Sequence, residues 1–461
     1  MNKLKKERIM KKLFCICMLM VAFSVNVMSE EDPDKYYIRN SLYMIKLDEA
    51  NTNEEYNTAF QNMNATFDTI NFANNYERYN DFSLGMRHID FSKLPEVTDA
   101  EKKQYERDNA LQNYMNQLLV QQGFKKASED EEYVAKLMKY FEENRIANKL
   151  VAKWHNKQGT PEGECNWDDQ LSVIVELGLK GASTEALDNA RKTENLTQLA
   201  SGSENKLLTN SYLCVVRYGY ADAKEYVAVA TAVAEYGISM MPALAQTAAK
   251  LGLKAIASKI KGYFVRANAY LFQIDWNESL YKKFYDKYWN DPTGFMEDPD
   301  FKLKYVGKSS KYAPATLSLK KSATEEKLIS RATVRGTDAA IAALQRDYEN
   351  FRPMSTLHVI DGKLGSYIGL KEGVKSGDKF DVFELTVDEK TQLADWKNVG
   401  SIKVDKGAVW DNRLGAGEVL EDEAEDKTDK DANNASSAGY TAFKEKPSKK
   451  IGDGCMIRLS K

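Results

Sequence analysis

Hydrophobic residues in the first third of the chain recur at spacings of three and four, as in an amphipathic helix. The first such stripe consists of Tyr56, Phe60, Met63, Phe67 and Ile70. The capping box Thr52–Glu55 precedes it, and two more boxes, Thr98–Glu101 and Ser128–Glu131, open similar stretches. The stripe covers barely two heptads, so a helix packed on a core is favoured over a coiled coil. The pattern predicts a helical region over residues 30–158.

The pattern changes at Gly159–Gly163, a stretch with glycine and proline that is typical of a domain boundary. Three stretches then have the composition or alternation of strands: Ser211–Arg217, Gly262–Asp275 and Phe301–Gly307. A long helix is expected at Thr324–Phe351. Together these elements predict an α+β middle domain over residues 164–355.

The segment Tyr226–Ile260 lies between the first two of these strands and is rich in alanine and leucine. Charged residues and Pro242 interrupt it before it reaches the roughly 20 apolar residues that a membrane span needs. A packed helical crossover is therefore favoured over a membrane segment.

Apolar and charged residues alternate along Lys379–Thr386 and again along Val399–Asp405, as in half-buried strands. The turn Ser376–Asp378 precedes the first of them. We expect Gly377 to take a positive φ and to direct this strand back along Ile368–Leu370, because glycine adopts that conformation without a Cβ clash.

Two late strands, Thr441–Phe443 and Cys455–Leu459, would close a small β-barrel over residues 356–461. Residues 421–438 inside it are acidic, small and polar, and they cannot bury enough apolar area to order themselves, so we expect a flexible insertion. This insertion has the one-three-five spacing of a calcium loop at Asp429, Asp431 and Asn433. The turn glycine and closing glutamate are missing, so no tight site is expected, whereas loose calcium binding stays open.

The amino terminus has the layout of a secretory signal. Six basic residues precede the apolar run Leu13–Val25, which is too short for a comfortable membrane span. We expect residues 1–29 to be removed after Ser29, with an uncleaved anchor as the alternative, and no transmembrane helix in the mature chain. The remaining 59 basic and 67 acidic residues give a net charge of −8, which disfavours nucleic acid as a partner.

Residues suited to catalysis form no recognisable motif. The histidines His88, His155 and His358 are widely separated, and the cysteines beyond residue 29 lie at Cys165, Cys214 and Cys455. This odd and scattered set of cysteines fits neither a disulfide framework nor a zinc site. We therefore predict no catalytic residue, no cofactor and no bound metal.

One segment, Trp410, Asp411, Asn412 and Arg413, is the candidate contact site for a ligand or partner. Tryptophan offers a surface for stacking, and the three polar side chains supply hydrogen bonds of both signs. The alternative is a polar turn that ends a strand, with Trp410 packed inward.

The run Ile368–Val382 resembles the carboxy-terminal small-barrel module of the flagellar assembly protein T family, whose middle domain looks like those of curli-export and TolB-type envelope proteins. With Val399–Val404 and Trp410–Arg413 added, the pattern is also similar to a group of uncharacterised secreted Gram-negative proteins, over roughly Ala147 to Lys461. These resemblances imply a fold and an envelope setting, and they transfer no catalytic residue.

The sequence therefore predicts a non-enzymatic protein of the periplasm, the outer membrane or the cell surface that acts through contacts with an envelope protein partner. Two alternatives stay open. One is a glycan-binding or adhesion protein, and the other is a hydrolase whose carboxylates are dispersed in sequence and meet only in space.

Overall fold

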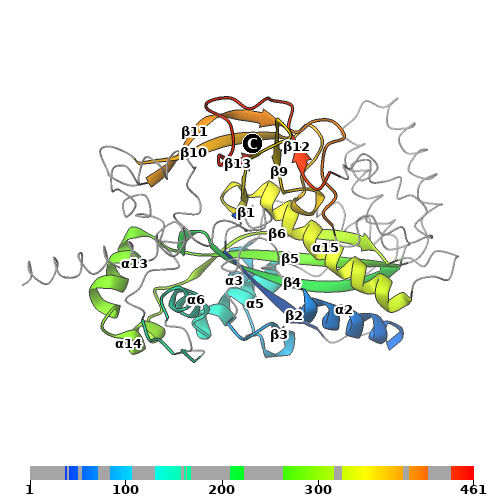
Figure 1. Ribbon diagram of the computed structural model, residues 1–461. Helices are drawn as coiled ribbons and strands as arrows, with labels where there is room; N and C mark the ends of the chain where they lie inside the picture. Colours follow the sequence, from blue (N-terminus) through cyan, green and yellow to red (C-terminus); the bar gives the residue numbers. More distant parts are fainter. Residues whose placement is uncertain are drawn as a thin grey trace, which may run out of the picture.

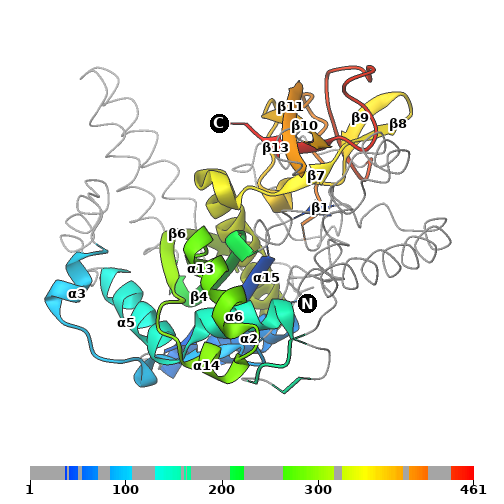
Figure 2. The ribbon, with the colours of Figure 1, turned by 90° about the vertical axis from the view of Figure 1, so that its left-hand side faces the viewer.

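The computed structural model describes residues 37–38, 41–49, 54–70, 84–105, 130–156, 160–161, 164–167, 208–222, 263–315, 324–387, 394–413 and 438–460. A five-stranded sheet with helices on both faces makes up the larger part, and the C-terminal strands form a smaller module beyond helix α15 (Figures 1 and 2). The mixed α+β class expected from the sequence is confirmed.

The large sheet has the strand order β3-β2-β4-β5-β6. Its strands are β2 (Ser41–Asp48), β3 (His88–Asp90), β4 (Ser211–Asp222), β5 (Tyr263–Ile274) and β6 (Leu303–Pro314). β2 runs parallel to both β3 and β4, whereas β5 runs antiparallel to β4 and β6. Helices cover both faces of this sheet, which explains why its central strands are almost continuously apolar.

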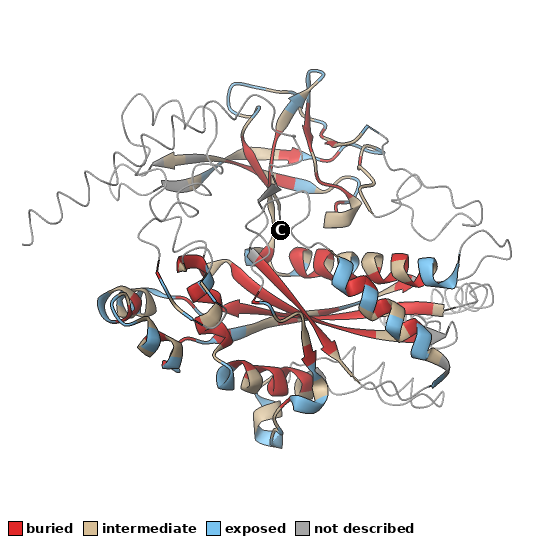
Figure 3. Cartoon of the chain, turned by 60° about the horizontal axis from the view of Figure 1, so that its bottom comes forward, coloured by how far each residue is buried: buried red, intermediate tan, exposed pale blue. Residues whose placement is uncertain are grey.

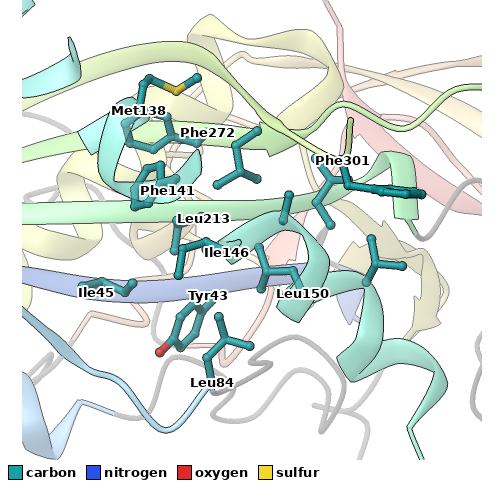
Figure 4. Packing of buried hydrophobic residues seen from close by; sticks show 14 of the residues in the cluster. Tyr43, Ile45, Leu84, Met138, Phe141, Ile146, Leu150, Leu213, Phe272 and Phe301 are labelled. Atoms are coloured by element: carbon teal, nitrogen blue, oxygen red, sulfur yellow. The ribbon is translucent and has the colours of Figure 1, made fainter. Parts of the chain in front are cut away.

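Two sets of helices cover this sheet. One face packs on α2 (Asn57–Thr69) and α15 (Glu325–Asp347). The other packs on α5 (Asp130–Glu143), α6 (Ile146–His155), α13 (Glu278–Lys283) and α14 (Pro292–Glu297). Figure 4 shows the second layer, where Phe141 of α5 meets Phe272 of β5 at a ring distance of 5.0 Å.

Predicted helix starts occur where the sequence placed them. Thr98 and Glu101 form the expected capping box at α3 (Asp99–Lys103). The Thr324 side chain accepts a hydrogen bond from the backbone N–H of Lys327 and so caps α15. The box at Thr98 depends on residues three positions apart, which is why the sequence alone revealed it.

The C-terminal module consists of two sheets. The first has the order β1-β7-β13-β10-β11 and the second the order β12-β9-β8. Their strands are β1 (Tyr37–Ile38), β7 (Met354–Thr356), β8 (His358–Ile360), β9 (Lys363–Ser366), β10 (Lys379–Val387), β11 (Ala394–Lys403), β12 (Thr441–Ala442) and β13 (Met456–Leu459). One apolar cluster, which includes Leu364, Val382, Val404 and Phe443, lies between the two sheets.

The region before residue 158, which was expected to be mostly helical, also contains two strands of the large sheet. Ser41–Asp48 and His88–Asp90 form strands of the large sheet, and β2 lies between β3 and β4. A strand buried on both faces lacks polar alternation, and a short apolar run does not distinguish strand from helix. The expected helix at residues 57–69 and those beyond residue 130 are present.

The structure also differs from two expectations about the C-terminal module, the closed barrel and the strand that pairs with β10. A single antiparallel bridge between Val404 and Phe443 links the two sheets, and no closed ring of strands is found among the described residues. Gly377 does have a positive φ of 79°. However, β10 pairs with β11 and β13 instead of Ile368–Leu370, because Leu370–Glu372 forms a 3-10 turn (η6) bound elsewhere.

The described residues include no helix that is long and apolar enough to cross a membrane. The signal at residues 1–29, the crossover at Tyr226–Ile260 and residues 421–437 of the acidic insertion lie outside the described part of the chain. So do Thr52 and Ser128, the two other expected helix caps.

Candidate functional site

The segment predicted as a contact site is bound to the turn η6 (Leu370–Glu372) of its own module. The carbonyl of Trp410 accepts a hydrogen bond from the backbone N–H of Leu370 at 2.9 Å. Asn412 accepts one from the N–H of Lys371 at 2.8 Å and donates one to Glu372 at 2.7 Å. These bonds engage Asn412 on both sides of its amide, so the segment holds the module together at this point.

Glycine is required where this segment meets the turn. A Cβ on Gly369 would lie 2.1 Å from the carbonyl oxygen of Trp410, which is closer than a real Cβ contact. The two residues form a parallel bridge there. This close approach explains the glycine in the motif Ile368-Gly369-Leu370.

The other two predicted residues, Asp411 and Arg413, bind each other. The Arg413 guanidinium donates to Asp411 at 2.9 and 2.8 Å. Burial opposes ionisation of Asp411, but the hydrogen bonds and positive charge of Arg413 outweigh it and lower the pKa of Asp411 below its ordinary value. The structure thus brings all four residues together, with their polar groups directed mainly to partners inside the module.

His155 is the last residue of α6, and its ring is buried in an aromatic cluster that includes residues of the segment after β5. Its ring centroid is 4.9 Å from that of Phe284, 6.0 Å from Trp289 and 6.1 Å from Trp167. Burial lowers the pKa of His155 to about 4, because the low-polarity surroundings disfavour its charged form. This imidazole is therefore neutral at ordinary pH and packs as a ring.

His88 lies at the edge of the large sheet between two carboxylates. Its Nδ1 is 2.9 Å from Asp48 and its Nε2 is 2.7 Å from Asp68. The buried Lys46 forms an ion pair with Asp48. Because both ring nitrogens are already engaged, His88 has no nitrogen directed at a substrate in this arrangement. The cluster ties α2 to β2 and β3, and the sequence could not reveal it because its members are up to 42 positions apart.

A small pocket lies between α15 and the C-terminal module. Apolar walls from Ile368, Val374 and Phe380 meet the arginines Arg346 and Arg352 there. Arg346 binds Asp378 at 2.7 Å and the carbonyl of Gly373 at 2.9 Å, and Arg352 binds the carbonyl of Leu459 at 3.3 Å. Both arginines fasten the module to α15, so this pocket is part of a structural junction.

The strands β10 and β11 extend beyond the rest of their sheet as a two-stranded arm (Figure 1). β13 pairs with β10 only from Phe380 to Phe383, whereas the β10–β11 pairing continues to Val387 and Ala394. Among the described strands, the outer half of this arm therefore has no third neighbour. Lys397 on β11 is exposed, and Trp396 is half-buried.

Six exposed lysines gather near the base of this arm, and we call them the lysine face: Lys379, Lys403, Lys444, Lys446, Lys449 and Lys450. Lys379 and Lys403 are directly opposite each other on β10 and β11. The backbone N–H of Lys444 donates to the carbonyl of Lys403 at 2.9 Å, which places the loop 444–450 beside β11. Figure 3 shows that the strands of the large sheet are mostly buried, whereas exposed residues gather on loops and on the outer sides of helices.

Several lysines of the large sheet and its helices form ion pairs with acidic side chains. Lys283 binds Asp298 and Asp300, Lys136 binds Glu96 and Glu132, and Lys302 binds Glu142. In the described part of the chain, the lysine face has no comparable ion pair. The run Lys444–Lys450 was visible in the sequence as a basic stretch, but its contact with Lys403 depends on strand pairing.

The described residues hold no group of three or more His, Cys, Asp or Glu side chains that could bind a metal ion. The calcium-like spacing at Asp429, Asp431 and Asn433 lies outside the described residues. Compared with protein-family models and with curated proteins, the chain matches none of them.

Proposed function

We propose that the chain is a non-enzymatic exported protein of the cell envelope that acts through contacts with another protein. The arm formed by β10 and β11 is the observation that carries this proposal. A two-stranded ribbon is marginally stable alone in water. A strand with an open edge also gives a partner main-chain groups to pair with.

The partner protein would contact the outer half of the arm. Glu384 is opposite Lys397 there, and Leu385 is opposite Trp396. The first pair is of opposite charge, a type that stabilises a hairpin. A partner strand added along β11 would extend this ribbon and would gain an aromatic anchor from Trp396.

The polar groups of the chain support binding over catalysis. Both nitrogens of His88 are engaged by carboxylates, and Asp411 and Arg413 neutralise each other. The two sheets of the C-terminal module share one apolar core, although they form no closed barrel among the described residues. We therefore infer that this module is the contact-making part and that the large sheet supports it.

Export is tested by the amino terminus of the protein in its native host. We expect the mature chain to begin at about Glu30 and to be found outside the cytoplasm. Mass spectrometry of the purified native protein gives this terminus directly. An intact Met1 or Met10 in the cytosolic fraction would contradict the proposal.

The contact itself is tested with a photo-crosslinking amino acid at Lys397 of the arm. The matched control places the same group at Lys304 on β6, which is also exposed and on an edge strand. We expect one discrete protein adduct in envelope fractions from position 397 and none from position 304. The absence of an adduct, or the same adduct from both positions, would rule out the arm as the contact.

A further inference from the structure

The lysine face contains two like charges on neighbouring strands, an arrangement that lowers the stability of the folded chain. Lys379 and Lys403 are directly opposite on neighbouring strands, and like charges at such positions are destabilising. Further along the same hairpin, Lys397 is opposite Glu384. Opposite charges therefore face each other in the outer half of the arm, whereas like charges face each other at its base.

Four acidic residues lie near the lysine face, and one of them is paired with a cation. Asp378 binds Arg346 of α15, and Asp381 accepts a hydrogen bond from Ser460. Glu445 accepts one from the backbone N–H of Lys403, and Asp405 accepts one from that of Lys406. Asp381, Glu445 and Asp405 keep their charge, because their donors are neutral, but six lysines outnumber these three carboxylates. The face is thus locally positive on a chain whose net charge is −3.

The composition of the face indicates the kind of partner. All six charges are lysines, which are flexible point charges, whereas bidentate recognition of a single phosphate or carboxylate uses arginine. Lysine is depleted at protein–protein interfaces, where buried aromatic or arginine anchors supply the affinity. The one large hydrophobic side chain that is exposed in the described residues, Val359, lies on β8 in the other sheet.

Clusters of four to eight basic residues of this kind bind anionic lipid surfaces, to which each charge contributes independently. We propose that the lysine face lies against a membrane surface and that its ammonium groups contact the phosphates of anionic lipid headgroups. Such contact needs no groove and no insertion. It would hold the module at the surface and leave the outer half of the β10–β11 arm accessible.

The experiment uses the full chain and vesicles of phosphatidylcholine, with or without phosphatidylglycerol, in a co-sedimentation assay. We expect binding only to vesicles that contain phosphatidylglycerol, and weaker binding as salt is raised, because salt screens exposed charges. The triple variant K446Q/K449Q/K450Q should bind about 100-fold more weakly, since each lysine near an anionic surface contributes roughly a factor of five.

The control variant K282Q/K302Q/K304Q removes the same charge from exposed lysines of the large part of the chain. It should bind vesicles nearly as well as the wild type. Equal losses in both variants would show that only net charge matters and would overturn the proposal, as would no binding of the wild type to anionic vesicles. Release by inorganic phosphate beyond that by chloride at equal ionic strength would instead indicate a discrete phosphate site.

Competition separates a lipid surface from an acidic protein. A poly-glutamate peptide that binds the lysine face while anionic vesicles do not would assign the face to a protein partner and overturn the proposal. The stability of K379Q gives an independent readout, because this change removes one of two opposed like charges. Its melting temperature should equal or exceed that of the wild type, and a clear decrease would mean that Lys379 has a structural role.

Discussion

The large sheet and the C-terminal module use their side chains in contrasting ways. In the large sheet, helices cover both faces and close an aromatic cluster around Phe284, and several surface lysines pair with acids. The module has a smaller core, an arm that extends past its sheet and a face of lysines without ion pairs in the described residues. Under the proposed function, the large sheet is the supporting part and the C-terminal module is the contact-making part.

The largest expected effect falls in the supporting part. Phe284→Ala removes a fully buried ring that contacts Trp167, Phe295 and other rings, and it should lower the free energy of unfolding by about 3–5 kcal/mol. Lys397→Ala on the arm should change it by less than about 0.5 kcal/mol. Urea unfolding measures both, and similar losses in the two variants would break the distinction between the regions.

A pH effect is expected from the same aromatic cluster. The pKa of His155 is about 4 in the folded chain against 6.5 for an ordinary histidine, so the unfolded chain binds its proton first as pH falls. Stability should therefore decrease between pH 6.5 and pH 4, by about 3 kcal/mol from this group. In His155→Phe, urea midpoints should depend less on pH across this window. Parallel curves for the variant and the wild type would contradict the assignment.

Substitutions in the turn before β10 test whether the conformation of Gly377 stabilises the C-terminal module. Gly377 has a φ of 79°, so Gly377→Val should destabilise the chain by about 1–2 kcal/mol or more, because a Cβ, and above all a branched one, disfavours that conformation. Ser376→Ala, at the neighbouring exposed position, should have little effect. Thermal melts compare the two variants. Equal melting temperatures for Gly377→Val and the wild type would show that the turn does not constrain β10.

The smallest effect is expected from the acidic insertion. Deleting residues 422–437 should change the free energy of unfolding by only about 1 kcal/mol, since loop-closure entropy varies slowly with length. The flanking residues Arg413 and Ala438 both lie in the module, so the shortened loop still joins them. Chemical unfolding of the deletion variant measures this, and a loss of several kcal/mol would indicate that the insertion packs on the fold.

Short-range patterns made the local elements predictable. The capping box at Thr98, the alternation along β10 and the positive φ of Gly377 depend on residues within a few positions of each other. The strand β4 and the long β5 were also expected, although each is longer or differently bounded than the sequence indicated. In each case, hydrogen bonding and sterics over a few residues determine the element.

Tertiary structure decided how these elements combine. β2 and β3 became part of the large sheet because parallel pairing with β4 buries an apolar run that could equally have been helical. The predicted contact segment Trp410–Arg413 is hydrogen-bonded to η6 of its own module. Strand β10 pairs with β11 and β13. None of these pairings follows from periodicity, because they join residues far apart along the chain.

The same division applies to the candidate surfaces. The sequence by itself determined the mixed α+β class and the positions of several helices and strands. It also contains a basic run at Lys444–Lys450, whose surroundings no local pattern revealed. Only the tertiary structure brought that run beside Lys403, placed Lys379 opposite it and left the outer half of β10 and β11 without a third strand among those described. A local pattern fixes which face a side chain takes, but long-range pairing fixes which charges become neighbours.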